Sequence, residues 1–350
     1  MTPIGDKVHF AVVGCGHIGK RHAEMIRRSD DASLVALCEV NEDGKASLAE
    51  YEVPVYSDME EMLKQHPEID VVNICTPNGL HAEQSILALE HRKHVVCEKP
   101  LGLTKASCEQ IIFKALQVSR HVFGVMQNRY SPPSVWLKEM VESGRLGDIY
   151  MVQINCFWNR DDRYYNKAGW KGTANLDGGT LFTQFSHFID IMYWLFGDIG
   201  DIQGRFADFN HQHTTDFEDS GMVNFRFLNG GLGSIHYSTS VWDQNLESSM
   251  TIIGSKGSIK VGGQYMNQVD YCHVDNYTMP ELDQSGPAND YGPYKGSAAN
   301  HHFIIANVVD TLQNKTMATT NALEGLKVVD IIERIYELRN QSKLYYPNNK

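Results

Sequence analysis

The chain has 350 residues, about the length of two domains, and its 42% hydrophobic and 21% charged residues are typical of a folded protein. Its net charge of −12 argues against a nucleic-acid surface, and no apolar run reaches the roughly 18–20 residues of a membrane span. The seven cysteines form no CxxC pair and lie mostly in apolar segments, which favours a reducing cytoplasmic setting with buried thiols.

The first third of the chain alternates apolar segments with amphipathic ones. Strands are expected at 9–16, 33–40, 70–77, 94–100 and from 121, and helices at 17–29, 46–52, 81–92 and 104–119. Strands and helices that alternate with short links indicate a parallel sheet covered by helices on both faces.

The pattern changes after a helix that we expect at 131–144. Longer strands follow at 148–158, 221–240, 249–255 and 257–263, with hairpin signals at NGG and SKG and helices at 181–196, 298–314 and 320–340. The predicted fold class is α/β, with an N-terminal Rossmann doubly wound parallel sheet and a C-terminal α/β domain built on an open, mainly antiparallel sheet. We place the domains at residues 1–127 and 128–350, with the C-terminal helix a candidate to pack back on the first domain. Residues 265–297 form a long excursion, either a lid or an oligomer contact.

The segment GCGHIG (14–19) is a GxGxxG motif between a predicted strand and a predicted helix, the context that dinucleotide binding requires. Gly14 permits the turn, Gly16 lets the backbone approach the pyrophosphate, and Gly19 lets helix and strand pack closely. Glu39 follows the second strand, where a carboxylate can bind the ribose hydroxyls and repel a 2′-phosphate, so NAD is favoured over NADP. The alternative is a glycine-rich turn with an incidental exposed glutamate.

Several polar residues follow the later strands of this sheet. Ligands bind at the carboxyl ends of parallel strands, so we expect them on the same edge as the glycine loop. Lys99 follows an apolar strand directly, and a partly desolvated amine beside a nicotinamide can act as a base on a secondary alcohol. The alternative for Lys99 is a solvated loop lysine, and for the segment at 76–78 a simple turn. The expected cofactor contacts are Gly14, Gly16, His17, Ile18, Gly19, Glu39, Thr76, Asn78, His81, Glu98 and Gln127.

A second set of candidates lies on the helix expected at 181–196. Thr183 and His187 are four residues apart and therefore share one helical face, with Gln184 adjacent. On spacing alone, His187 is more often a satisfied core histidine than a catalyst.

Four segments in this order, GCGHIG, TPNGLH, CEKP and GGTLFTQFSHFIDIMYWLFG, resemble the glucose–fructose oxidoreductase/inositol dehydrogenase (Gfo/Idh/MocA) family over essentially the whole chain. The resemblance implies that Lys99 lies beside the nicotinamide and that His187 faces the same substrate hydroxyl, so these two are the expected catalytic residues. Many members carry an acid four residues before that histidine. Here the position is Thr183, which cannot act as a general base, and this puts the inositol-dehydrogenase version of the mechanism in doubt.

Within the family, segments such as NCFWNRDDRYYNKAGWKGT (155–173) and NLESSMTIIGSKGSIKVGG (245–263) resemble the UDP-N-acetylglucosaminuronate 3-dehydrogenases. Those enzymes oxidise the sugar 3-hydroxyl, and an aminotransferase then acts on the ketone in surface polysaccharide synthesis. An anionic substrate suits the basic cluster of Arg129, Arg160, Arg163, Lys167 and Lys171, with Tyr164, Tyr165 and Trp170 as stacking faces. The alternative is a charged surface loop over core aromatics. The expected substrate contacts are Asn128, Arg129, Arg163, Tyr165, Trp170, Lys171, Thr183 and Gln184.

The function predicted from the sequence is therefore NAD-dependent oxidation of a sugar hydroxyl, most simply the 3-hydroxyl of UDP-N-acetylglucosaminuronate, with no metal. One alternative is a dehydrogenase of a free polyol or sugar of the inositol type. Another is a non-catalytic NAD- and sugar-binding regulator. The strands GMVNFRF and GSIHYST carry apolar residues at alternating positions, so we expect a homo-oligomer, dimer or tetramer, through the second sheet.

Overall fold

The computed structural model describes residues 6–165, 169–313 and 315–341, and the chain divides into two compact units. The first unit contains Met1–Met126 and His301–Val329, and the second contains Gln127–Asn300 and Asp330–Lys350. The chain passes from the first unit to the second after Met126 and returns to the first at His301, where helix α8 (His301–Leu312) packs on α1 (His17–Arg28).

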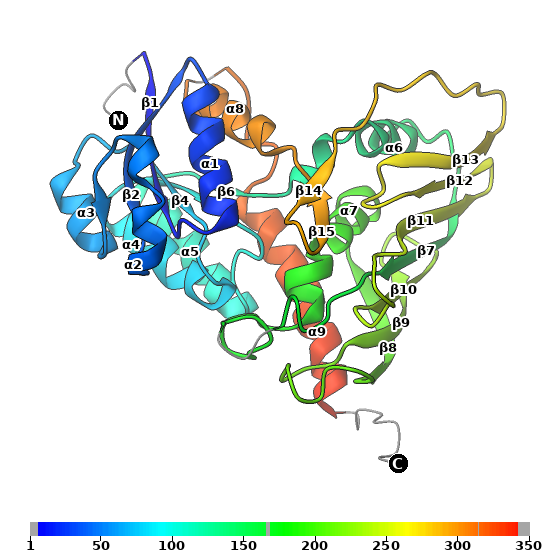
Figure 1. Ribbon diagram of the computed structural model, residues 1–350. Helices are drawn as coiled ribbons and strands as arrows, with labels where there is room; N and C mark the ends of the chain where they lie inside the picture. The colour runs from blue at the N-terminus through cyan, green and yellow to red at the C-terminus, as the bar shows by residue number, and fades with distance from the viewer. Residues whose placement is uncertain (1–5, 166–168, 314, 342–350) are drawn as a thin grey trace. The chain divides into compact units, whose positions relative to one another are not determined.

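The first unit is built on a six-stranded parallel sheet in the order β3-β2-β1-β4-β5-β6 (Figure 1), as the sequence predicts for a Rossmann fold. The strands are β1 (Val8–Val13), β2 (Ala32–Cys38), β3 (Val55–Tyr56), β4 (Val71–Ile74), β5 (His94–Cys97) and β6 (Val122–Gly124). β4 and β5 are buried at every position, which explains why their sequences, VVNI and HVVC, are mainly apolar rather than alternating.

The outer edge of this sheet is completed by a distant part of the chain. The backbone N–H of Gly124 donates to the Thr320 carbonyl at 3.1 Å, and the Thr320 hydroxyl donates back to the Gly124 carbonyl. Phe123 and Asn321 form an antiparallel bridge. Residues just before α9 (Ala322–Gln341) therefore cover the free edge of β6.

The helices of the first unit follow the predicted alternation with local adjustments. They are α1, α2 (Glu42–Ala46), α3 (Met59–Gln65), α4 (His81–Glu90), α5 (Lys105–Val118) and α8. Thr104 caps α5, with its hydroxyl oxygen accepting from the backbone N–H of Ser107 at 3.1 Å. The helix expected at 46–52 is replaced by α2 and a short 3-10 turn at Ala49–Tyr51.

The second unit is built on a seven-stranded sheet in the order β13-β12-β11-β7-β10-β9-β8. The strands are β7 (Ile149–Phe157), β8 (Ile199–Ala207), β9 (Ser220–Phe227), β10 (Leu232–Ser238), β11 (Glu247–Gly254), β12 (Gly257–Gly262) and β13 (Gln268–Val274). Only β7 and β10 pair in parallel among these neighbours, so the sheet is mainly antiparallel, as expected. The NGG signal forms the predicted hairpin, with positive φ at Gly230 and Gly231.

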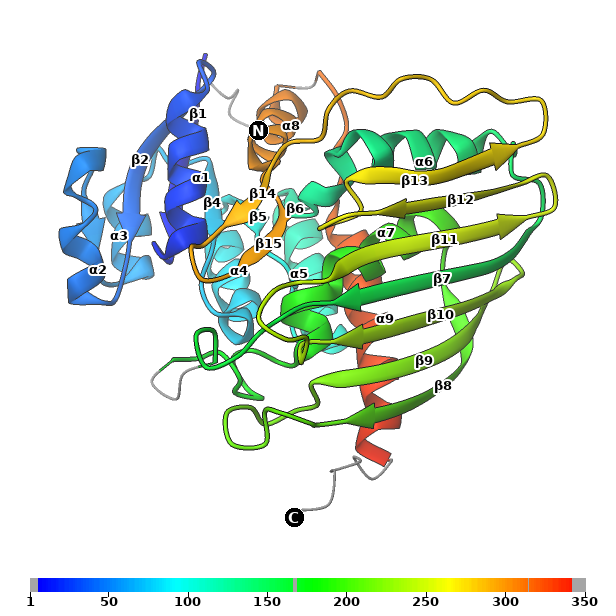
Figure 2. The same ribbon diagram turned by 45° about the vertical axis from the view of Figure 1, so that its right-hand side comes forward.

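Helices cover one face of this sheet. Figure 2 shows α6 (Pro132–Glu142), α7 (Ser186–Phe196) and the C-terminal part of α9 behind the strands. The segment at 265–297 is less irregular than expected, because it contains β13 and a two-stranded ribbon of β14 (Ala288–Asp290) and β15 (Lys295–Ala298).

The other face of the sheet carries a mixture of polar and apolar side chains. The alternating apolar residues of β9 and β10 that the sequence analysis assigned to an interface are buried beneath the helices instead. The strand register places Ile253, Met151 and Leu232 in one row across β11, β7 and β10, and all three are exposed. An apolar row therefore lies on the outer face of the sheet.

Two further features concern the cysteines and the search for membrane-spanning helices. All seven cysteines are free thiols. Among the residues that the structure describes, no helix combines the length and the apolar character that spanning a membrane would require.

Candidate active site

The glycine loop between β1 and α1 has the geometry that a dinucleotide pyrophosphate requires. Gly14 has a φ of +83°, and a Cβ there would lie 2.7 Å from Thr76 Cγ2, so both the conformation and the space demand glycine. A Cβ on Gly19 would lie 1.9 Å from the Gly14 carbonyl oxygen, which shows how closely α1 approaches the loop. A Cβ on Gly16 would meet no atom within 4 Å, so this part of the backbone is open to a phosphate.

Glu39 follows β2 and lies beside the glycine loop. Its Oε2 accepts a hydrogen bond from the backbone N–H of Cys15 at 2.8 Å, and its Oε1 accepts one from Asn41 at 2.8 Å. Each carboxylate oxygen keeps a further lone pair for a ribose hydroxyl. His17, exposed, and Ile18, half-buried, begin α1 directly after the loop. These residues fit NAD, whose pyrophosphate the loop would hold and whose adenine ribose Glu39 would hold.

The turn after β4 is held by side chains of its own unit. The Thr76 hydroxyl donates to Gln84 Oε1 at 2.5 Å, and Asn78 is buried in a 3-10 turn. His81 is buried, with Nδ1 2.7 Å from the Pro100 carbonyl oxygen and Nε2 2.8 Å from the Thr76 carbonyl oxygen. Burial lowers the pKa of His81, and the contacts with the Pro100 and Thr76 carbonyls oppose this shift only in part. Both nitrogens thus face the backbone, so His81 holds the turn after β4 against the loop at Pro100, and its expected cofactor contact stays a prediction.

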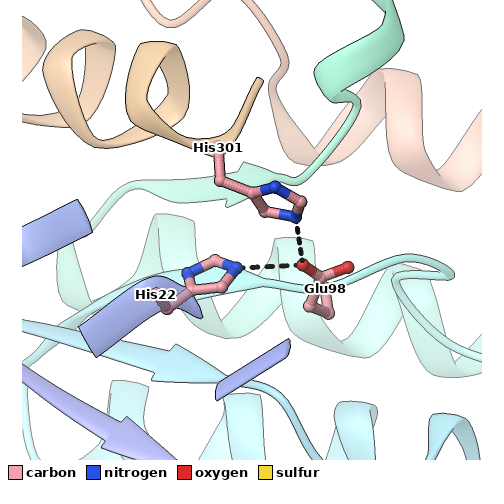
Figure 3. Close-up of side chains that lie close together, drawn as sticks. All are labelled: His22, Glu98 and His301. Atoms are coloured by element: carbon pink, nitrogen blue, oxygen red, sulfur yellow. Dashed lines mark hydrogen bonds and ion pairs between the residues drawn. The ribbon is translucent and has the colours of Figure 1, made fainter. Parts of the chain in front are cut away.

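Glu98 is a buried carboxylate held by two histidines from different helices (Figure 3). His22 Nε2 on α1 lies 2.9 Å from Glu98 Oε1, and His301 Nε2 at the start of α8 lies 3.3 Å from the same oxygen. Asn73 Nδ2 lies 2.8 Å from His22 Nδ1, which fixes the His22 proton on Nε2. Burial would raise the pKa of Glu98, but the hydrogen bonds to His22 and His301 outweigh it and hold the pKa well below its usual range. Glu98 is therefore ionised.

Lys99 lies at the end of β5, half-buried, at the edge of the sheet where the strands end. Its backbone N–H donates to Glu98 Oε2 at 3.2 Å, and the Lys99–Pro100 peptide bond is cis. Because His81 contacts the Pro100 carbonyl and Glu98 holds the Lys99 backbone, the loop that carries the amine is fixed from two sides.

In the second unit, His187 follows a break in helical register. Leu181–Phe185 form a π-helical turn, and α7 starts at Ser186. The expected single α-helix with Thr183 and His187 on one face is therefore wrong locally, because π turns widen the spacing. His187 is buried, and its Nε2 lies 3.2 Å from Gln127 Nε2. With the Gln127 amide donating, His187 Nε2 is the acceptor and its ring proton is on Nδ1.

Thr183 is bonded to a carboxylate that the sequence analysis did not single out. Its hydroxyl donates to the carboxylate of Asp177, and its Oγ1 also lies 3.1 Å from the Asp177 carbonyl oxygen. Asp177 is fully buried, and its Oδ2 accepts from the backbone N–H of Gly172 at 2.8 Å. The acid that Thr183 lacks is thus present one hydrogen bond away.

Two of the expected substrate-binding arginines are engaged by carboxylates. Arg129 is buried and makes a bidentate pair with Asp190, with Nε–Oδ2 at 2.8 Å and Nη2–Oδ1 at 2.5 Å. Arg163 is exposed and pairs with Asp161, with Nε at 2.9 and 3.0 Å from its two oxygens. A bidentate pair of this kind neutralises the charge of the guanidinium, which weakens the case for Arg129 and Arg163 as anion-binding residues, and their substrate contacts stay a prediction.

The other basic residues of this loop converge on aromatic rings. Arg160 Nε donates to Gln184 Oε1 at 2.8 Å, and Lys171 Nζ donates to the Tyr294 hydroxyl at 3.0 Å. Of the remaining expected contacts, Tyr165 is buried against Phe217, Trp170 is half-buried, and Asn128 Oδ1 accepts from Ala298 at 3.2 Å. Lys167 lies outside the described residues.

Two groups of three side chains have ligand atoms within 4.8 Å of one another and were tested as metal sites: His22, Glu98 and His301, and Asp208, His211 and Asp219. In the first, the Nε2 proton of His22 occupies the direction in which a cation would bind. In the second, His211 Nδ1 lies 3.2 Å from Asp219 Oδ2 and Nε2 donates to the Arg160 carbonyl. Since both acceptors require a proton, His211 is an imidazolium and has no lone pair for a metal. Both groups are described best as hydrogen-bonded clusters.

Sequence reasoning missed the residues that support the site from a distance in the chain. Asp177 and Tyr294 belong to glycine-rich loops without periodicity. His301 is different, because the two histidines at the start of the helix expected at 298–314 were candidates for either the pocket or a structural role. A weak signal existed for His22, which lies four residues before Ile26 on the buried side of α1.

Comparisons with known proteins show the family to which the chain belongs. Residues 8–124 match the family described as "Oxidoreductase family, NAD-binding Rossmann fold", and residues 135–260 match "GFO/IDH/MocA C-terminal domain". A "Myo-inositol 2-dehydrogenase" of Thermotoga maritima is 29% identical over 262 residues, covering 72% of this chain and 74% of the relative.

Two solved structures match nearly the whole chain. The WlbA dehydrogenase from Bordetella pertussis, in complex with NADH and UDP-GlcNAcA, is 31% identical with a TM-score of 0.85, covering 98% of this chain and 100% of that one. The WlbA dehydrogenase from Chromobacterium violaceum, with the same two ligands, is 30% identical with a TM-score of 0.86, covering 100% and 99%.

Proposed function

Because the chain belongs to the Gfo/Idh/MocA family of NAD-dependent oxidoreductases, we propose that it oxidises a secondary hydroxyl of an anionic nucleotide sugar, the 3-hydroxyl of UDP-N-acetylglucosaminuronate. The observation that carries this proposal is the match across both units to two dehydrogenases crystallised with NADH and UDP-GlcNAcA. The product would be a 3-keto nucleotide sugar, suited to an aminotransferase in surface polysaccharide synthesis.

The proposed reaction breaks the C–H bond at the carbinol carbon and the O–H bond of the hydroxyl. Bound NAD supplies the acceptor for the hydride. Lys99 Nζ, in its unprotonated form, takes the hydroxyl proton, so the alcohol loses a hydride and a proton and becomes a ketone. His187 acts on the same hydroxyl as a hydrogen-bonding and proton-relaying partner, and the Gln127 amide orients its ring.

Thr183 and Gln184 hold the sugar in this proposal rather than move a proton. The Thr183 hydroxyl is committed to Asp177 as a donor, so toward a substrate its oxygen is an acceptor for a sugar hydroxyl. Gln184 is held by Arg160 and keeps its amide group for hydrogen bonding.

A second candidate function is oxidation of a free polyol, which the identity to the Thermotoga inositol dehydrogenase favours. The threonine at position 183 weighs against it, because many members of the family carry an acid there.

The experiment is a substrate panel with the purified full chain and NAD, followed by the absorbance of reduced nicotinamide. We expect turnover with UDP-N-acetylglucosaminuronate and little with myo-inositol or glucose. Lys99→Ala is expected to lower kcat by about 10²–10⁴-fold while NADH still binds, measured by fluorescence titration. Turnover of myo-inositol without turnover of the nucleotide sugar would favour the second candidate. Normal turnover by Lys99→Ala would remove the assigned role of the lysine.

A further inference from the structure

We propose that Arg160 and Lys171, with the rings of Tyr164 and Tyr294, form a subsite that binds an oxyanion of the substrate, a carboxylate or a phosphate. All four residues belong to the second unit. The inference rests on the proposed function, because the anion is part of the sugar substrate.

Arg160 is a buried cation without a carboxylate partner among the described residues. The residue is 3% exposed, and its guanidinium donates to Gln184 Oε1, to the carbonyls of Asn159 at 2.6 Å and Lys295 at 3.0 Å, and to Asn245 Oδ1 at 3.2 Å. Every one of these partners is neutral. Burying a charge without a counter-charge is costly, and an arginine cannot avoid the cost by losing its proton. The contrast is Arg129, whose charge Asp190 neutralises.

Lys171 brings a second cation to the same rings. Its Nζ lies 4.0 Å from the ring centre of Tyr164 and 5.1 Å from that of Tyr294, while Arg160 Cζ lies 5.2 and 5.1 Å from the same centres. Burial raises the pKa of the Tyr164 hydroxyl, so that ring is neutral. Cation–π contacts offset part of the desolvation, yet two cations that share two neutral rings still repel each other.

Among the described residues, no carboxylate forms an ion pair with Arg160 or Lys171. Nearby Asp161 pairs with Arg163 instead. The residues outside the described ranges, 1–5, 166–168, 314 and 342–350, contain no Asp or Glu. The counter-charge in this proposal is the oxyanion of a bound ligand.

The subsite is also rigidly built and tied to the catalytic segment. The Arg160 carbonyl accepts from His211, and Trp158 packs on the guanidinium with its ring centre 4.7 Å from Cζ. Gln184 joins Arg160 to the π turn that leads into His187. An anion held here would fix one end of a sugar relative to that histidine, and neutral polyols would lack this contact.

The test is isothermal titration calorimetry of the full chain saturated with NAD. The probes are UDP-N-acetylglucosaminuronate, UDP-N-acetylglucosamine, which lacks the carboxylate, and glucuronate, which lacks the diphosphate. The variant is Lys171→Met, which keeps the aliphatic stem of the half-buried side chain and spares the hydrogen bonds that Arg160 makes to the fold. Lys256→Met, on an exposed turn, is the matched control.

We expect Lys171→Met to weaken binding about tenfold or more, because one charge-assisted hydrogen bond is lost. Lys256→Met should leave binding unchanged. If Lys171→Met binds both nucleotide sugars more weakly but glucuronate as wild type does, the subsite binds the diphosphate. If it binds both uronates more weakly but UDP-N-acetylglucosamine as wild type does, the subsite binds the carboxylate. If wild type binds none of the probes, or Lys171→Met binds each as wild type does, the subsite is overturned.

The outcome is separable from that of the proposed function. Weaker binding by Lys171→Met in a chain that turns over none of the nucleotide sugars keeps the subsite and removes the function. Turnover of UDP-N-acetylglucosaminuronate with an unchanged KM in Lys171→Met keeps the function and removes the subsite.

Discussion

The hydroxyl of Thr183 donates its proton to the buried carboxylate of Asp177. A threonine has a single hydroxyl proton, so this bond leaves Thr183 Oγ1 as an acceptor only. The position at which many members of the family carry an acid is therefore backed by an acid from the preceding loop.

This relationship makes Thr183→Asp an informative change. It would place a second carboxylate against Asp177 in a buried site, and like charges so close raise the pKa of one of the pair. We expect a lower melting temperature and no gain of turnover with myo-inositol, whereas Thr183→Ser should behave as wild type. A Thr183→Asp protein that is as stable as wild type and oxidises inositol would contradict the argument.

The cofactor preference should depend on Glu39. Glu39→Ala removes the carboxylate that lies between the glycine loop and Asn41, and with it the acceptor proposed for the ribose hydroxyls. We expect the dissociation constant for NAD to rise about 10- to 100-fold, since hydrogen bonds to charged groups contribute about 1.5–3 kcal/mol. The discrimination against NADP should fall at the same time. Titration of both cofactors measures this, and Glu42→Ala on exposed α2 serves as the control.

The Glu98 cluster should contribute to stability and to the placement of Lys99. Glu98→Gln exchanges an ionised acceptor for an amide that cannot accept from both histidines in the same way. We expect the free energy of unfolding to fall by about 2–3 kcal/mol, together with a loss of kcat. Denaturant unfolding and steady-state kinetics measure the two effects, with Glu90→Gln at the exposed end of α4 as the control. Unchanged values for both would show that the cluster is dispensable.

His211 should make stability depend on pH. Burial lowers the pKa of His211, but its bonds to Asp219 and to the Arg160 carbonyl outweigh burial and raise it. A histidine whose pKa is raised by folding stabilises the folded state. This contribution is fully present below about pH 6.5 and is lost as the pH rises through the pKa of the folded state. Burial also raises the pKa of Asp208, to about 6, so its contribution is likewise lost as the pH rises.

Thermal unfolding across neutral pH checks this. We expect the melting temperature of wild type to fall as the pH rises above about 6.5 and that of His211→Gln to change less over the same interval. The pKa of Asp219 is lowered to about 2. Its contribution to stability is therefore lost as the pH falls, and only in acid, so it does not affect the curve near neutral pH. Parallel curves for wild type and His211→Gln would exclude the imidazolium.

The outer face of the second sheet provides a prediction about assembly. Ile253, Met151 and Leu232 form an exposed apolar row, and we expect copies of the chain to associate through it. Met151→Lys would place a charge in the middle of the row, so light scattering should report a smaller species than for wild type. A monomeric wild type at working concentration would remove this expectation.

The sequence was most informative where one physical requirement determined each residue. Gly14 and Gly19 could be assigned because their neighbours leave no room for a side chain. The buried strands could be assigned because a parallel sheet covered on both faces needs mainly apolar runs. The fold class and NAD binding followed from these residues.

Sequence patterns were least informative where partners come from distant segments. Arg129, Arg160 and Arg163 look alike in the sequence, and only the folded chain shows that Asp190 and Asp161 neutralise two of them while Arg160 keeps its charge. The π turn before His187 was hidden for a similar reason, because apolar spacing does not distinguish it from an α-helix.

The bonds between Gly124 and Thr320 have a practical consequence for dissecting the chain. A fragment that stops at the end of β6 would contain the glycine loop and Lys99, yet it would expose unpaired backbone groups along that strand, ready to recruit strands from other molecules. Such a truncation should precipitate on expression. A soluble nucleotide-binding fragment would need residues 301–329 restored, through a circular permutation or a fused linker.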